Sequence, residues 1–468
     1  AGANGDITFT GAVNLGTGGL TIDNAAIVEV SSTFAAAAFT QTAGTTSTTF
    51  DNTTATTGAF DFNGQALTLS GVTNTAATMT VTNAGTFTTG DAATMVIAGD
   101  FIQDGTGANV IGDNLTSTND GFNFLRAVTI TSTDDIQITM TDGAAGDDLV
   151  FQSTLTGTDD NLAINAGANG DITFTGAVNL GTGGLTIDNA AIVEVSSTFA
   201  AAAFTQTAGT TSTTFDNTTA TTGAFDFNGQ ALTLSGATNT AATMTITNAG
   251  AFTTGDAATM VITGEFVQDG AGNSVIGDDL TSTNDGFAFA TNVTLTSGDA
   301  LTIQTGENTG DDLVITGTLT ETNNPNLTID AGAAGNITLT GAVNLGTGTL
   351  TIRDAAIVEV SSTLAAAAFT QTDGTTSTTI DNTATIAGAF AFTGNALTLS
   401  GANNTVGTTM TVTNAGAFTT GDAANLTVGT EFVQNGAGNS VIGDDLTSTA
   451  DGFAFATNVT LTSGDALT

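Results

Sequence analysis

The chain is built from closely similar copies of one long segment, and this repeat constrains the fold more than any other feature. The copies begin at Ala1, Ala166 and Ala331, and residues 1–71 return unchanged as residues 166–236. A catalytic site is needed only once, whereas a chain that copies itself this closely supplies length or a multiplied surface. We therefore interpret the chain as tandem repeats of one continuous solenoid. The repeats are 1–165, 166–330 and an incomplete 331–468.

The composition excludes several classes of function. There are 44 acidic residues against 2 basic ones, a net charge of −42, and no Cys or His. Without Cys, disulfides and thiolate metal sites are impossible, and without His and Cys so are the usual nucleophilic triads and His-based acid–base catalysis. The negative field repels nucleic acid and anionic lipid, and no run of 18 apolar residues exists to span a bilayer. We expect no nucleic-acid partner and no membrane insertion.

The local pattern predicts short β-strands. Apolar residues alternate with Thr, as in the runs that begin at Asp6 and Ile136. This is the period of a strand with one buried face, and β-branched Thr suits a pleated surface. Gly, Asn and Asp interrupt the runs roughly every ten residues and supply turns. The Ala run from Ala35 to Ala38 is too short to nucleate a helix, so we expect an all-β protein.

A finer period inside the large one predicts the architecture. The strand pattern that begins at Asn292 returns at Asp312 and again at Asn336. A unit of about 20–24 residues is the size of one coil of a β-solenoid, here a parallel β-helix of about 20 coils stacked about 4.8 Å apart. A string of β-sandwich domains is the alternative. The coil-scale period and the single proline, Pro325, favour the solenoid.

Differences between the copies indicate which residues point inward. Phe34 of the first copy becomes Leu364 in the third, and Phe50 becomes Ile380. These are exchanges between core-forming residues, which a packed interior tolerates. We expect an interior of Ile, Val, Leu and Phe ladders. The third copy also has one extra residue near Asn403–Gly407, where we predict a turn.

The acidic residues raise the question of calcium. Two carboxylates stacked on neighbouring coils, about 4.8 Å apart, repel by about 0.9 kcal/mol in bulk water. Either the acids are staggered between coils, or hard cations bridge some of them. No cofactor is implied apart from this possible Ca²⁺. The candidate ligands lie at three corresponding corners: Asp113, Asn114, Asp278, Asp279, Asp444 and Asp445.

Two further acidic patterns have simpler interpretations. The segment 269–277 resembles one unit of the calcium-binding nonapeptide of RTX proteins, but Ser274 replaces the ligand Asp and the motif occurs once per repeat, so we interpret it as an ordinary corner. Pairs such as Asp147–Asp148 and Asp311–Asp312 offer the two carboxylates of a glycosidase; we interpret them as solvated corners. We expect no catalytic residues and no enzyme. A single non-repeated cluster of acids in a groove would favour an enzyme acting on polysaccharide.

Threonine rows raise ice binding as a lesser alternative. The pairs Thr8/Thr10 and Thr129/Thr131 have the Thr-x-Thr spacing of flat ice-binding ladders. Asp, Asn and Gln interrupt these rows, and most outward positions of such a sheet would be Thr in any case. The pattern therefore favours an ordinary solvent-facing sheet.

Two longer patterns resemble a known family. They are the Gly-Asp-Ile-Thr-Phe-Thr-Gly-Ala-Val-Asn-Leu run from Gly5 and the Met-Thr-Val/Ile-Thr-Asn-Ala-Gly runs from Met79, Met244 and Met410. Both resemble filamentous-haemagglutinin-like repeats, which occur in large secreted bacterial surface proteins, including autotransporter and two-partner-secretion adhesins. The resemblance covers the whole chain. It implies a right-handed β-helix, export to the cell surface and an adhesive or fibrous role.

These observations predict a structural extracellular filament or adhesin stalk at the cell surface. We recognise no cap at Ala1 or Thr468, so we expect each end to be continued, by more chain or by another copy. The expected partners are the chain itself, end to end or as a longer array, and a host or matrix surface. The alternative from a different class is a Ca²⁺-binding surface or matrix module.

Overall fold

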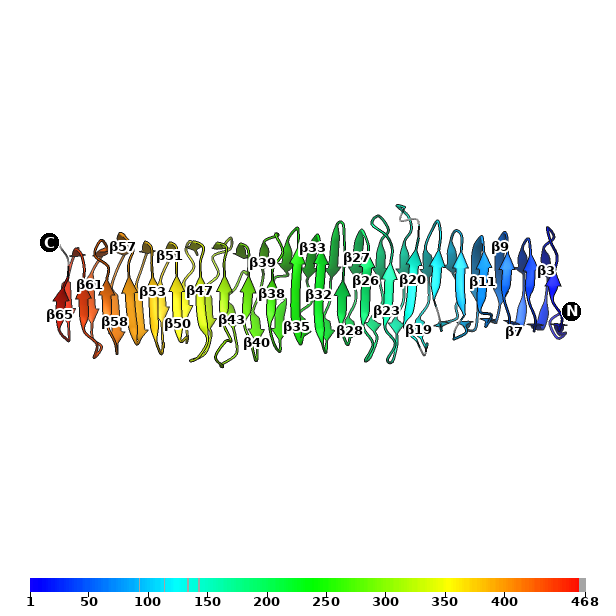
Figure 1. Ribbon diagram of the computed structural model, residues 1–468, viewed down its shortest axis with the longest axis horizontal. Helices are drawn as coiled ribbons and strands as arrows, with labels where there is room; N and C mark the ends of the chain where they lie inside the picture. Colours follow the sequence, from blue (N-terminus) through cyan, green and yellow to red (C-terminus); the bar gives the residue numbers. More distant parts are fainter. Residues whose placement is uncertain (92, 113, 133, 142–143, 463–468) are drawn as a thin grey trace. The chain divides into compact units, whose positions relative to one another are not determined.

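The computed structural model describes residues 1–91, 93–112, 114–132, 134–141 and 144–462. These residues form two compact units, Ala1–Thr233 and Leu234–Thr468. Each unit is a stack of short parallel strands (Figure 1). Within the described ranges we find no helix. Among these residues there is therefore no helix that is long and apolar enough to cross a membrane.

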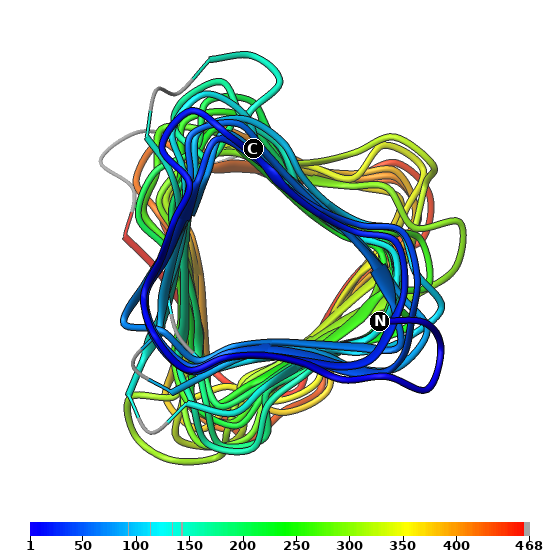
Figure 2. The same ribbon diagram turned by 90° about the vertical axis from the view of Figure 1, so that its right-hand side faces the viewer.

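Each coil consists of three short strands joined by turns, and each strand pairs in parallel with the strand three places later. Thus β1 (Ile7–Phe9) lies beside β4 (Ala25–Val30), and Ile7 pairs with Val28. Seen end-on, the coils have three sides (Figure 2). The described residues form about 21 right-handed coils of roughly 21 residues each. The predicted all-β solenoid is confirmed, and the parallel pairing excludes the antiparallel sandwich.

The first unit, blue to green in Figure 1, contains three sheets. Its first sheet has β1 (Ile7–Phe9), β4 (Ala25–Val30), β7 (Gly44–Phe50), β10 (Ala66–Leu69), β13 (Phe87–Thr89), β16 (Asn109–Ile111), β19 (Val128–Ile130), β22 (Leu155–Thr156), β25 (Val178–Asn179), β28 (Phe199–Ala201) and β31 (Thr219–Thr221). Its second sheet has β2 (Val13–Asn14), β5 (Phe34–Ala36), β8 (Thr54–Thr56), β11 (Thr73–Ala76), β14 (Thr94–Ile97), β17 (Leu115–Ser117), β20 (Ile136–Met140), β23 (Leu162–Asn165), β26 (Leu185–Asn189), β29 (Phe204–Gln206) and β32 (Ala224–Gly229). Its third sheet has β3 (Leu20–Ile22), β6 (Phe39–Gln41), β9 (Ala59–Gly64), β12 (Thr78–Asn83), β15 (Phe101–Gln103), β18 (Phe122–Phe124), β21 (Leu149–Phe151), β24 (Ile172–Phe174), β27 (Ile192–Val195) and β30 (Ser212–Phe215). The boundary between the units falls within β33 (Ala231–Leu234).

The second unit, green to red, has the same three-sheet plan. Its first sheet has β34 (Thr238–Ala241), β37 (Thr259–Ile262), β40 (Leu280–Ser282), β43 (Leu301–Gln304), β46 (Leu327–Asp330), β49 (Leu350–Ile352), β52 (Phe369–Gln371), β55 (Phe390–Gly394), β58 (Met410–Asn414), β61 (Glu431–Gln434) and β64 (Gly452–Phe455). Its second sheet has β35 (Thr243–Asn248), β38 (Phe266–Gln268), β41 (Phe287–Phe289), β44 (Leu313–Ile315), β47 (Asn336–Leu339), β50 (Ile357–Val360), β53 (Ser377–Ile380), β56 (Ala396–Leu399), β59 (Phe418–Thr420), β62 (Ser440–Ile442) and β65 (Val459–Leu461). Its third sheet has β36 (Phe252–Thr254), β39 (Ser274–Ile276), β42 (Val293–Leu295), β45 (Leu319–Glu321), β48 (Val343–Asn344), β51 (Leu364–Ala366), β54 (Ala384–Ile386), β57 (Asn403–Val406), β60 (Asn425–Val428) and β63 (Leu446–Ser448).

Phenylalanine rings fill much of the interior of each unit. In the first unit, Phe124, Phe151 and Phe174 form a column with ring centroids 5.3 Å apart and nearly parallel planes. Because parallel pairing places equivalent residues of neighbouring coils one above the other, the rings stack. Phe34 and its third-copy counterpart Leu364 are both buried, so the predicted inward position is confirmed.

The interior is not wholly apolar, which differs from the expectation. Gln103 is fully buried, and its Nε2 donates to Asn83 Oδ1 over 2.7 Å and to the Gly107 carbonyl over 3.2 Å. Gln268 and Gln434 repeat this arrangement in the later copies. The buried amides satisfy corner carbonyls that would otherwise lie unpaired away from water.

The extra residue of the third copy lies beside the predicted position. Asn403–Val406 form strand β57, so the turn predicted there is wrong for these residues. Strand β57 begins at Asn403, and its counterpart β34 begins at Thr238. The interval between these two residues equals that between Ala166 and Ala331, the starts of the two repeats, so no residue has been inserted before β57. Met410 lies one position further from Met244 than this spacing requires. The insertion therefore falls in the turn of residues 407–409, where pairing places no constraint on length.

The arrangement of the repeats along the chain stays a prediction. The boundary between the two units, after Thr233, falls inside the second repeat and does not coincide with a repeat boundary. That residues 1–165, 166–330 and 331–468 form one continuous solenoid is therefore still an expectation from the sequence.

Candidate functional site

Carboxylates on the strands are staggered between coils. Glu194 pairs with Thr173 on one side and Thr214 on the other. The same Thr–acid–Thr order occurs at three other acids. Glu29 lies between Thr8 and Thr49, Asp61 between Thr40 and Thr80, and Glu359 between Thr338 and Thr379. At these positions a neutral Thr separates each acid from the next coil, so the repulsion between stacked carboxylates is avoided without a cation.

Of the two cation ligands predicted in the first unit, the structure describes one, Asn114. Asp113 lies outside the described residues. The Asn114 Oδ1 accepts a hydrogen bond from the Gln137 N–H of the next coil, at 2.7 Å. An amide oxygen used in this way joins one coil to the next.

The predicted ligands in the second unit act similarly. Asp279 Oδ1 accepts the Thr302 N–H of the next coil at 2.6 Å, and Asp278 Oδ1 accepts the Asp279 N–H at 2.7 Å. Asp444 Oδ1 accepts the Asp445 N–H at 2.8 Å. The described part of the chain contains no group of three or more acidic residues suited to hold a metal ion. Ca²⁺ binding at these corners stays a prediction.

Two of the Gly-Asp-Asp corners, those of Asp147 and Asp311, differ from the solvated turns that we expected. Asp147 is 1% exposed and Asp311 is 4% exposed. Asp147 Oδ2 accepts the Ala144 N–H at 2.8 Å, and Asp311 Oδ2 accepts the Asn308 N–H at 2.7 Å. The first Asp of each pair is therefore a buried cap that closes its own loop, because burial requires its oxygens to be hydrogen-bonded.

A charged groove occurs at one corner where the second repeat meets the third copy. Its volume is about 480 Å³, and its ionisable lining residues are Glu307, Asp330, Arg353, Asp354 and Asp373. We call this the third-copy groove. Arg353 Nη1 lies 3.4 Å from Asp330 Oδ2 and is largely exposed. An exposed ion pair of this kind contributes little to stability.

Four of the five charges of this groove are not repeated. Asp354 replaces Asn24 and Asn189 of the earlier copies, and Asp373 replaces Ala43 and Ala208. Likewise Asp330 replaces Asn165, and Arg353 replaces Asp188. This is a non-repeated cluster of acids in a groove, the feature that we expected to favour an enzyme acting on polysaccharide. The signal was present in the sequence as substitutions between copies.

Burial raises the pKa of Asp354 above its usual value of 3.8, and the charge of Asp373 raises it further. The Ala355 N–H opposes the shift by lowering the pKa, while Asp330 and Glu307 add smaller increases. Among the residues that the structure describes, the buried Oδ1 of Asp354 has no hydrogen-bond partner. A carboxylate in such surroundings favours a proton or a cation.

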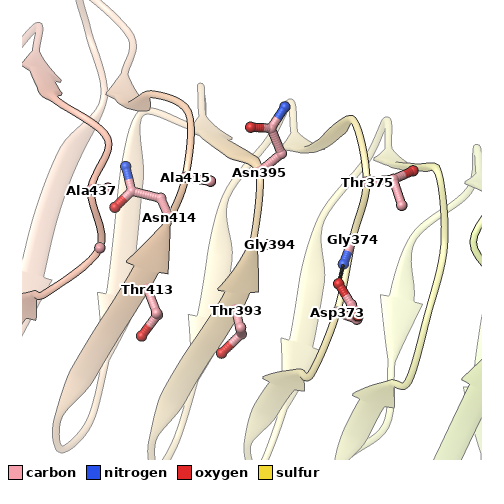
Figure 3. A pocket seen from close by; sticks show the side chains of 11 residues that line it. Asp373, Gly374, Thr375, Thr393, Gly394, Asn395, Thr413, Asn414, Ala415 and Ala437 are labelled. Atoms are coloured by element: carbon pink, nitrogen blue, oxygen red, sulfur yellow. Dashed lines mark hydrogen bonds between the residues drawn. The ribbon is translucent and has the colours of Figure 1, made fainter.

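A second groove, of about 610 Å³, continues from Asp373 along the same corner. Figure 3 shows its lining of small and polar side chains, with Thr393 and Thr413 on successive strands and Asn395 near the rim. No aromatic residue lines it. It therefore lacks the flat platforms on which sugar rings usually stack.

The threonine rows are interrupted, as the sequence indicated. On the first sheet, Thr49, Thr68 and Thr88 follow one another, and Val110 then breaks the row. On the third sheet Thr80 lies between Asp61 and Ile102. These sheets therefore do not present the long regular Thr array that ice binding would require.

Comparison with known proteins identifies no relative. No protein-family model, no curated protein and no solved structure matches the chain.

Proposed function

We propose that the chain is a structural repeat protein, a stalk or filament segment on the outside of a cell. The observation that carries this proposal is the strand register. Glu194 stands between Thr173 and Thr214, and Glu359 has the same threonine neighbours one repeat later. The threonine neighbours allow the coils to stack without repulsion between carboxylates, and stacking of similar units is what a tandem repeat is expected to provide.

The cell-surface location rests on composition and resemblance. The filamentous-haemagglutinin-like pattern from Gly5 implies export and an adhesive role. The net charge of −42 would keep long faces soluble and discourage lateral bundling. The lack of Lys leaves trypsin only Arg126 and Arg353, which suits exposure to proteases.

We also propose that copies of the chain associate end to end. In β65, Val459 is 40% exposed and Leu461 is 63% exposed, and Phe453 of β64 is 43% exposed. An unpaired strand edge with apolar side chains accepts another strand. A second copy of the chain would cover this edge.

Imaging tests the proposal. Negative-stain electron microscopy of the purified chain should show elongated particles. Labelling of intact producing cells with an antibody against the chain should stain their surface. Compact globules, or staining only after the cells are permeabilised, would refute the structural and the surface parts respectively.

The third-copy groove favours divalent-cation binding as a second candidate function. The observation that supports it is the pair of acids Asp354 and Asp373: a buried Asp354 oxygen has no hydrogen-bond partner among the described residues, and the charge of Asp373 raises the pKa of Asp354. Calcium should raise the melting temperature, and the double substitution Asp354→Asn with Asp373→Ala, which restores the residues of the earlier copies, should abolish that rise. An unchanged melting temperature with calcium or with a chelator removes this candidate.

We propose that the chain has no enzymatic activity. The third-copy groove is where a polysaccharide-cleaving activity would reside, because paired carboxylates perform glycoside hydrolysis. Incubation with neutral and acidic polysaccharides should release no reducing ends. Release that disappears in the Asp354→Asn and Asp373→Ala variant would overturn this part of the proposal.

A further inference from the structure

One corner of the third copy carries Asn-Gly where the other two copies carry Asp-Gly. The pair is Asn435–Gly436, and the corresponding acids are Asp104 and Asp269. The glycine is required by the fold, because a Cβ at Gly436 would overlap the Asn414 carbonyl oxygen. The sequence therefore holds an asparagine next to an unhindered backbone nitrogen.

The corner leaves the Asn435 side chain exposed and Gly436 half-buried. Asn435 follows the end of β61 and is exposed. The Gly436 N–H donates no hydrogen bond to any residue that the structure describes. The Asn435 Oδ1 accepts a hydrogen bond from Thr413 Oγ1 at 2.6 Å, which draws electron density from the side-chain carbonyl.

We propose that Asn435 is a site of spontaneous deamidation. The Gly436 backbone nitrogen attacks Asn435 Cγ, a C–N bond forms, the side-chain amide leaves as ammonia, and a cyclic succinimide results. Water then adds to one of the two imide carbonyls and opens the ring to aspartate or isoaspartate. The overall change exchanges the amide for a carboxyl group by consuming one water and releasing one ammonia, with no oxidant or enzyme.

The aspartate product is already accommodated twice in this fold. Thr82 Oγ1 donates to Asp104 Oδ1 at 2.6 Å, and Thr247 Oγ1 donates to Asp269 Oδ1 at 2.7 Å. Thr413 makes the same bond to Asn435. Deamidation through the normal linkage therefore converts the third copy to the chemistry of the first two without a change of fold.

The chain has four other Asn-Gly pairs, and the one at Asn63 provides an internal contrast. Asn63 and Gly64 lie within β9 and pair with Thr82 and Asn83 of β12. Succinimide formation there requires the strand to open first, because the extended paired backbone keeps the nitrogen away from Cγ. An opening of modest cost slows the reaction at Asn63 by about tenfold or more relative to Asn435.

The test is ageing of the intact chain in mildly alkaline buffer, followed by proteolysis and peptide mass mapping. The wild-type chain should gain the mass difference between Asn and Asp at Asn435 about tenfold faster than at Asn63. In denaturant the two sites should react at similar rates, since both are Asn-Gly. The variant Asn435→Gln should lose the fast phase.

Two results would overturn the proposal. One is that Asn63 reacts as fast as Asn435 in the folded chain, and the other is that Asn435 remains intact while it reacts in denaturant. The variant Asn435→Asp, which copies the earlier repeats, should fold and melt like the aged product. A melting temperature far below that of the wild type would show that the corner does not accommodate the carboxylate.

Discussion

Removal of one ring from the phenylalanine column of the first unit is expected to loosen only the neighbouring coils. Phe151 is 1% exposed and stacks on Phe124 and Phe174 at 5.3 Å on either side. The change Phe151→Ala removes a buried aromatic side chain, and its loss costs about 3–5 kcal/mol because a cavity remains. In a solenoid each coil contacts mainly its neighbours, so the cost should be felt locally.

Hydrogen exchange measured by mass spectrometry checks this expectation. A local loss of about 4 kcal/mol should speed amide exchange in β18, β21 and β24 by about a thousandfold. Coils near β4 should keep their wild-type protection. The matched control is Phe151→Ile, which copies Ile315 of the second repeat and should cost less than about 1.5 kcal/mol. Uniform loss of protection across the first unit, or an equal effect of both variants, would refute the reasoning.

Three further predictions concern charge and close contact. Because burial raises the pKa of Asp354 above 3.8, the folded chain holds its proton more tightly than the unfolded chain does. The stability that protonated Asp354 contributes is fully present below pH 3.8 and is lost as the pH rises through the pKa of Asp354 in the folded chain. Asp354→Asn should therefore raise the melting temperature at pH 7 but not at pH 3. Asn189→Asp, which introduces the acid into the second repeat, should lower the melting temperature at pH 7. The change Thr214→Glu places a second carboxylate beside Glu194 and should cost about 1 kcal/mol more than Thr214→Gln, a difference that high salt reduces in denaturant titrations. A Cβ at Gly107 would overlap the Gly85 carbonyl oxygen of the preceding coil, so Gly107→Ala should lose protection at that corner in hydrogen exchange; unchanged protection would contradict the close approach.

Much of the fold could be predicted from the sequence because periodicity reports directly on it. Alternation in runs such as that from Ile136 gives strands, and returns such as Asp312 to Asn336 give the coil length. The exchange of Phe50 for Ile380 correctly marked an inward position, since both side chains are buried. These signals are local or strictly repeated, so they survive without knowledge of tertiary contacts.

The polar interior could not be predicted by the same means. Gln103 and Asp147 are residue types that usually lie at the surface, and only the turn of the chain around them shows that they cap buried backbone groups. The staggering of acids was one of two options in the sequence. On the strands the register shows staggering, because it places Thr173 and Thr214 around Glu194; at corners such as that of Asp354 and Asp373 acids lie near one another.

The candidate site was visible in the sequence only by comparing the copies with one another. Asp354 and Asp373 are ordinary acids in isolation, but both are new in the third copy. The predicted ligands Asp279 and Asn114 were selected because acids and amides are dense at corners. Their oxygens accept backbone N–H groups of the next coil, a use that composition does not reveal.

Engineered disulfides test most directly whether each coil pairs in register with the next. The chain has no Cys, so in the double variant Thr173→Cys with Glu194→Cys the two introduced thiols are the only ones in the sequence. These residues face each other on neighbouring strands, where the Cα separation of about 4.8 Å permits a disulfide. The double variant should oxidise within one chain, whereas Thr173→Cys with Thr214→Cys, two coils apart at about 9.6 Å, should not. Efficient oxidation of the second pair, or failure of the first, would contradict the stacked-coil account.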